Sequence, residues 1–127
     1  MNPIANRLMM KAQKLLANAT KALEVGLNED AGRNAYLAGY HAARAFLYET
    51  EGKLFKTHNG LQAEFSRVVR DDPRFLPEAR VFLSQAFNLK KIADYEEGAD
   101  AEITPERAAA AIEKGAKFIQ CCFEAME

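Results

Sequence analysis

Cysteine and histidine are scarce in this chain of 127 residues, which contains two of each. The two cysteines, Cys121 and Cys122, are adjacent, and neighbours on a helix point about 100° apart, so they make poor disulfide partners. No cysteine or histidine lies at the spacing of a zinc site. We therefore expect core thiols, as in a reducing cytosol, and neither a metal site nor a cofactor.

The chain also lacks an excess of charge of one sign, because 17 basic residues oppose 18 acidic ones. No global basic field indicates nucleic acid binding, so any contact with RNA or a nucleotide has to be local. No run approaches the ~20 apolar residues that a membrane span needs. Lys11, Lys14 and Lys21 interrupt the first 22 residues, unlike a signal peptide. We expect a soluble cytoplasmic protein without a membrane partner.

Common catalytic motifs are missing as well. The seven glycines form no phosphate-binding loop, and the only serines, Ser66 and Ser84, fall in the middle of expected helices. No motif of a hydrolase or a kinase is present. No strand-like alternation and no internal repeat occur.

What the sequence does contain is apolar residues at helical spacing. Helix starts are marked at Pro3, Thr57 and 104–105, and helix ends at Gly26 and Gly52. The expected helices span 3–25, 30–51 (capped by Asn28 or Asp30), 58–69, from between 74 and 77 to about 94, and 105–126. We predict an all-α, up-and-down bundle of about five helices, forming one domain over residues 1–127.

The helix over 30–51 has two faces that are not typical of a solvated surface. One arc consists of small residues and a phenylalanine: Ala35, Ala38, Gly39, Ala42, Ala45 and Phe46. The opposite arc is larger and more polar: Tyr36, Leu37, Tyr40, His41, Arg44, Leu47 and Tyr48. Small residues let another backbone come close, whereas the polar tips need partners once buried. We expect the second face to be a wet cleft or a subunit interface, and we predict a homodimer.

Lys90 falls in the middle of the apolar arc of the helix over 77–94, and Asp94 lies on the same side four residues later. The spacing favours an ion pair along the helix. Two interpretations stay open: a polar cleft at a subunit boundary, or a lysine that extends past the edge of the core into water.

Two histidines and three tyrosines allow similar alternatives. His58, in the Lys-Thr-His-Asn-Gly turn, could help a helix N-terminus to hold a phosphate, or the turn could only cap the helix. His41 could be a base or a ligand, or a core histidine whose hydrogen bonds are satisfied. Tyr36, Tyr40 and Tyr48 could stack on bases or simply pack.

Several of these segments occur together in a known family. The run AYLAGYHAARAFL at 35–47, Gly52, KTHNGL at 56–61, Phe65 and NLKKIADY at 88–95 resemble the HEPN family (higher eukaryote and prokaryote nucleotide-binding). The similarity is greatest to its small prokaryotic members. It covers nearly the whole chain.

The resemblance implies a helical bundle that commonly dimerises. It also implies partnership with a minimal nucleotidyltransferase, or a role in toxin–antitoxin and RNA-processing systems. Many HEPN proteins are metal-independent ribonucleases that use an arginine and a histidine four to six residues apart. Here Lys90 or Lys91 stands near the arginine position and Asp94 near the histidine position. Lysine lacks the guanidinium fork, and an aspartate does not replace an imidazole poised near neutral pH.

The first hypothesis is therefore a non-catalytic HEPN partner that binds a nucleotide, an RNA segment or a nucleotidyltransferase, in a toxin–antitoxin-like system. The second is a ribonuclease toxin with a divergent site formed by Lys90, Asp94 and Tyr95, with His58 as a further candidate. The third is an interaction bundle without a ligand. The candidate ligand-binding residues are Lys90, Lys91, Tyr95, His58 and Arg44.

Overall fold

The computed structural model describes residues 1–95 and 102–127, and the helices in these two segments form the expected all-α bundle. The helices are α1 (Pro3–Glu24), α2 (Asn28–Glu51), α3 (His58–Val69), α4 (Pro77–Tyr95) and α5 (Pro105–Met126). The described residues form no strand. The prediction of an all-α bundle of about five helices is confirmed, and none of the described helices is long and apolar enough to cross a membrane.

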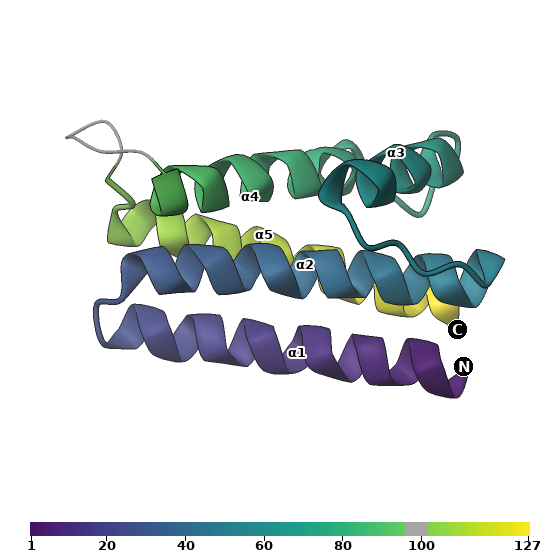
Figure 1. Cartoon of the computed structure of the whole chain (residues 1–127), viewed down its shortest axis with the longest axis horizontal. Coiled ribbons are helices and arrows are strands. Elements are labelled where there is room, and N and C mark those ends of the chain that lie inside the picture. The colour runs from purple at the N-terminus through teal and green to yellow at the C-terminus, as the bar shows by residue number, and fades with distance from the viewer. Residues whose placement is uncertain (96–101) are drawn as a thin grey trace.

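Helix α2 is the centre of the bundle and packs against each of the other four helices. Figure 1 shows α1 and α4 on opposite sides of α2, α5 behind it, and α3 near the C-terminal end of α2. The two chain ends lie at the same end of the bundle (Figure 1). The up-and-down arrangement follows from the short turns that join long helices.

The predicted helix caps are mostly confirmed. Thr57 accepts a hydrogen bond from the main-chain N–H of Gly60 at 3.1 Å, and Thr104 accepts one from Arg107 at 3.1 Å. Gly52 ends α2 with φ of 72°, a left-handed conformation in which a side chain would be strained. The caps could be predicted from the sequence because a cap depends on residues that are close in sequence.

The predicted start of α2 was wrong. The helix begins at Asn28, and its N-cap is Leu27, which provides no side-chain hydrogen bond. Gly26 adopts φ of 81°, and the main-chain N–H of Leu27 donates to the carbonyl of Ala22 at 2.8 Å. This tight turn brings the chain directly into α2, so neither Asn28 nor Asp30 occupies the capping position.

The small-residue face of α2 is packed as the pattern predicted. Its alanines are fully buried, and the ring of Phe82 lies against Gly39. A Cβ atom built on Gly39 would approach Phe82 Cε2 to 2.3 Å, closer than real Cβ atoms come. Phe82 in turn stacks on Phe118 of α5, with 4.9 Å between the ring centres. The glycine therefore allows α4 and α5 to meet against the middle of α2.

The opposite face of α2 is covered partly within the chain. Tyr36 is 5% exposed and contacts both His58 of α3 and Phe87 of α4. His41 and Leu47 are also buried. Since helices of the same chain cover this face, it supports the predicted homodimer less than the sequence pattern suggested, and the homodimer stays a prediction.

Candidate functional site

Lys90 and Asp94 form the expected ion pair at the end of α4, with 2.7 Å between Lys90 Nζ and Asp94 Oδ2. Arg33 of α2 closes the other side of the carboxylate by donating from Nε to Asp94 Oδ1. Arg33 also binds Asp30, with 2.6 Å between Nη1 and Oδ1. Hydrogen bonds from Lys90 and Arg33 lower the pKa of Asp94, and the bond to Asp94 raises the pKa of Lys90. Asp94 is therefore held as a carboxylate.

Tyr95, the last residue of α4, stands beside this network. It is 76% exposed, and Lys90 Nζ lies 5.5 Å from the centre of its ring. Lys90, Asp94 and Tyr95, the residues of the hypothetical ribonuclease site, thus lie together. They are not suited to act as a general acid and a general base near neutral pH, because Lys90 and Asp94 form an ion pair and Asp94 accepts hydrogen bonds from two cations.

His58 takes part in an aromatic cluster. Its ring stacks on Phe87 with 3.7 Å between centres and 9° between planes, and its Nδ1 lies 2.9 Å from Tyr36 Oη. Lys91 Nζ lies 5.5 Å from the centre of the Phe87 ring. The structure therefore brings together His58 and Lys91, which the sequence had named separately. We call His58, Phe87, Tyr36 and Lys91 the His58 cluster.

Burial sets the charge state of the His58 cluster. It lowers the pKa of His58, and the charge of Lys91 lowers it further, while Gln62 acts in the opposite direction. Burial also raises the pKa of Tyr36 to about 12, so the phenol keeps its proton. Near neutral pH the cluster thus presents neutral aromatic rings and one cation.

Arg44 lies apart from both groups and pairs with His41. Its Nη1 is 3.2 Å from His41 Nδ1, and its Cζ is 5.8 Å from the centre of the Tyr40 ring. Burial, with the nearby charges of Lys11 and Arg44, lowers the pKa of His41 to about 4. Because a guanidinium has only donors, Nδ1 accepts and the proton of the neutral imidazole lies on Nε2. His41 is buried and lies within hydrogen-bond distance of Arg44. This environment resembles that of a core histidine more than that of a base or a ligand.

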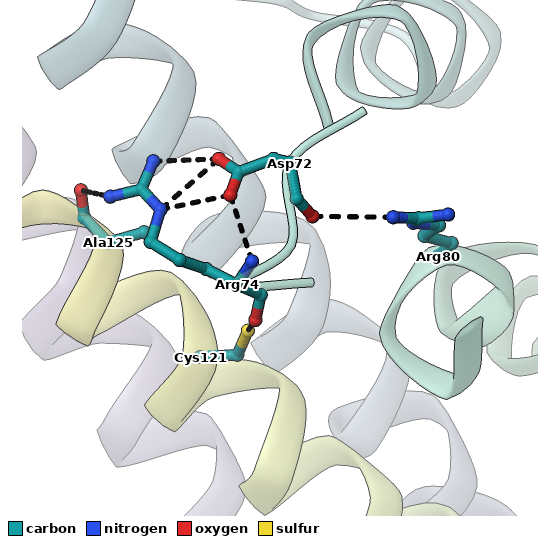
Figure 2. A network of polar contacts seen from close by, with 5 residues as sticks. All are labelled: Asp72, Arg74, Arg80, Cys121 and Ala125. Atoms are coloured by element: carbon teal, nitrogen blue, oxygen red, sulfur yellow. Dashed lines mark hydrogen bonds and ion pairs between the residues drawn. The ribbon is translucent and has the colours of Figure 1, made fainter. Parts of the chain in front are cut away.

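A separate polar network holds the connection between α3 and α4 against α5 (Figure 2). Arg74 Nη2 lies 2.7 Å from Asp72 Oδ2, Arg74 Nη1 donates to the carbonyl of Ala125, and Arg80 donates to the carbonyl of Asp72. Cys121 Sγ donates to the carbonyl of Arg74 at 3.1 Å. Burial raises the pKa of the Cys121 thiol, so this cysteine acts as a structural donor.

Both cysteines are free; Cys122 is fully buried, as expected of a core thiol, whereas Cys121 is only partly buried. Among the described residues no group of three or more histidine, cysteine, aspartate or glutamate side chains is placed to hold a metal ion.

Sequence reasoning missed two residues of these groups, Arg33 and Phe87. Arg33 carries a local signal, since Asp30 lies three residues earlier, but its main partner is 61 residues away. Phe87 was not named as a candidate residue. Its stacking on His58 depends on how α3 is placed, which no local pattern encodes.

The fold and these groups define a small helical bundle whose aromatic and charged side chains gather along α2, α3 and α4. The family model of the HEPN domain matches residues 5–125. A UPF0332 protein from Archaeoglobus fulgidus is 33% identical over 110 residues, which cover 87% of this chain and 85% of that protein. The chain belongs to the HEPN domain family, as the resemblance indicated.

Proposed function

We propose that this HEPN protein is a non-catalytic module that binds a nucleotide at the His58 cluster. The position of Lys91 carries the proposal. Its Nζ stands beside the stacked rings of Phe87 and His58, and no carboxylate in the described segments lies within ion-pair distance of it. An uncompensated cation next to partly exposed rings offers charge for a phosphate and a surface for a base.

The state of Asp94 supports the absence of catalysis. Cleavage of a phosphodiester without a metal needs a base for the 2′-hydroxyl and an acid for the leaving oxygen. Lys90 and Arg33 lower the pKa of Asp94, away from the neutral range. The lowered pKa of His58 leaves little imidazolium to donate a proton near pH 7. The second hypothesis, a divergent ribonuclease, therefore has less support.

The remaining candidate residues take different parts in the proposal. Tyr95 is exposed at the end of α4 and can add a ring surface for a base. Lys90 is engaged by Asp94, so its charge is less available to a phosphate than that of Lys91. Arg44 does not belong to the His58 cluster, because it pairs with His41.

The proposal includes partners that the resemblance implies. We propose a homodimer, and a minimal nucleotidyltransferase as a second partner, as in a toxin–antitoxin-like pair. Exposed apolar side chains on and just before α4 favour an interface there, since Leu76 is 64% exposed and Val81 is 44% exposed. A stable interface would bury about 2,000 Å² or more.

Titration calorimetry with ATP and with the four nucleoside monophosphates tests the nucleotide site. We expect the wild type to bind at least one of them, and Lys91→Ala to weaken that binding at least tenfold. Lys117→Ala is the matched control, because this lysine lies on α5 with a 79% exposed side chain. Absence of nucleotide binding by the wild type would refute the nucleotide site at the His58 cluster.

A gel assay with labelled RNA tests the absence of cleavage. We expect no degradation above background over hours. Degradation by the wild type that is abolished in Asp94→Asn or His58→Ala would refute the proposal and establish the ribonuclease.

A further inference from the structure

A row of basic side chains runs along the exposed face of α1. Arg7, Lys11, Lys14 and Lys21 are all exposed, and at 100° per residue they fall within an arc of about 80°. At a rise of 1.5 Å per residue the row is about 21 Å long. Helix α1 contains no acidic residue before Glu24, with which it ends. We call these four side chains the α1 stripe.

The α1 stripe is uncompensated, unlike Arg33, Arg67 and Arg74 elsewhere on the surface. Throughout the described chain, no carboxylate lies within ion-pair distance of any of its four members. By contrast, Arg67 pairs with two glutamates and Arg74 pairs with Asp72. Since the formal net charge of the whole chain is -1, the stripe is a local excess of positive charge.

Arg44 of α2 provides a second observation. Its Nε is buried and has no hydrogen-bond partner in the described parts of the chain, and none of their carboxylates pairs with it. Its neighbours are the neutral His41 and the ring of Tyr40. A half-buried cation without an anion is costly, so this environment is suited to an anionic ligand.

Arg44 and the α1 stripe belong to the same surface. The main-chain N–H of Asn2 donates to Glu49 Oε2 at 2.9 Å, so the start of α1 lies beside the end of α2. The two helices run in opposite directions (Figure 1), so five residues after Asn2 and five residues before Glu49 place Arg7 level with Arg44. Lys11 lies close enough to His41 for its charge to lower the pKa of that imidazole.

We propose that the α1 stripe and Arg44 bind the phosphodiester backbone of a single-stranded nucleic acid. A row about 21 Å long can contact several successive phosphates of one strand, more than a mononucleotide offers. The guanidinium of Arg44 can hold a phosphate through two donors, and the Tyr40 ring beside it can stack on a base. Tyr40 also stacks on Tyr36 of the His58 cluster, with 6.0 Å between ring centres, so the two sites adjoin, but the proposal rests on the cations of α1 and on Arg44 and does not depend on the proposed nucleotide site.

Fluorescence anisotropy with a labelled single-stranded RNA of 12 nucleotides tests the proposal. The triple variant Arg7→Ala, Lys11→Ala, Lys14→Ala removes three exposed cations, and we expect the dissociation constant to rise at least tenfold. The slope of log K against log salt should become shallower by about 2, because each phosphate contact on a single strand contributes about 0.7. A triple variant that binds like the wild type would overturn the proposal.

The matched control is Arg70→Ala, Lys114→Ala, Lys117→Ala, which removes the same charge from α5 and the end of α3, at positions that are also exposed. It should bind RNA like the wild type, and an equal loss of affinity would overturn the proposal by showing that only net charge matters.

Arg44→Lys keeps the positive charge but loses the two-donor guanidinium group, so RNA binding should weaken while the melting temperature stays unchanged. A normal affinity in this variant would remove Arg44 from the site.

Binding measurements with DNA and with anionic vesicles identify the class of ligand. Single-stranded DNA of the same sequence should bind if the backbone alone is recognised, and weaker binding of DNA than RNA would add a contact to the 2′-hydroxyl. Binding of anionic vesicles without binding of either strand would overturn the proposal in favour of a lipid surface.

The proposals for the two sites can be tested independently, since the α1 triple variant should retain ATP binding, and Lys91→Ala should retain RNA binding. If the wild type bound RNA but no nucleotide, only the proposal for the His58 cluster would be refuted.

Discussion

Gly39→Ala gives a sharp test of how closely α4 approaches α2. The new Cβ would lie 2.3 Å from Phe82 Cε2 and about 3.2 Å or more from the next two ring atoms. The ring has little room to move, because Phe82 is 3% exposed and stacks on Phe118. Overpacking of a core costs about 1–3 kcal/mol, while replacing a helical glycine by alanine gains about 0.5–1 kcal/mol. We expect a net loss of about 1–2 kcal/mol in the free energy of unfolding.

Gly115→Ala is the matched control, since it alters the same ring's surroundings from α5. Its Cβ would lie 3.4 Å from Phe82 Cζ, an ordinary contact, so the gain in helix propensity should dominate. We expect a stabilisation of about 0.5–1 kcal/mol. Urea denaturation followed by circular dichroism at 222 nm measures both variants. If Gly39→Ala were as stable as Gly115→Ala, the close packing of Phe82 on α2 would be refuted.

Three further outcomes follow from the same packing and charges. Ala42→Leu should destabilise the chain by roughly 1–3 kcal/mol, because Ala42 is fully buried and the added atoms overpack the core, and denaturant melts would detect this. Asp94→Asn should lose about 1 kcal/mol at pH 7, measured by the same melts. The folded pKa of Asp94 is lowered, so its contribution is complete above the unfolded pKa and is lost as pH falls through the folded pKa; the difference from wild type should vanish in strong acid. Light scattering at micromolar concentration should give the mass of two chains, and a single-chain mass would refute the homodimer.

The fold was largely predictable because its signals are local. Threonine caps at Thr57 and Thr104 depend on residues within one turn, and the small-residue arc of α2 repeats at helical spacing. The start of α2 was misplaced because the tight turn at Gly26 overrides the capping preference of Asn28. Capping preferences are weak compared with the geometry of a turn that is already bonded to the preceding helix.

The candidate groups were predictable only where both partners share a helix. The pair of Lys90 and Asp94 could be read from its spacing of four residues, and it forms. The contact between Tyr36 and His58 joins two helices across 22 residues, so neither residue alone predicts it. The same holds for Arg33, whose bond to Asp94 adds to that of Lys90 in lowering the pKa of this carboxyl.

The two adjacent lysines of α4 show why the binding proposal follows Lys91. Neighbours on a helix point about 100° apart, so Lys90 reaches Asp94 while Lys91 reaches the ring of Phe87. A lysine that is already paired must give up its carboxylate before it binds a phosphate, and that exchange offsets much of the attraction. A lysine beside neutral rings pays no such cost. If a nucleotide binds here, Lys91→Ala should therefore weaken its binding more than Lys90→Ala, and the reverse order in calorimetry would place the ligand at Asp94 and Tyr95.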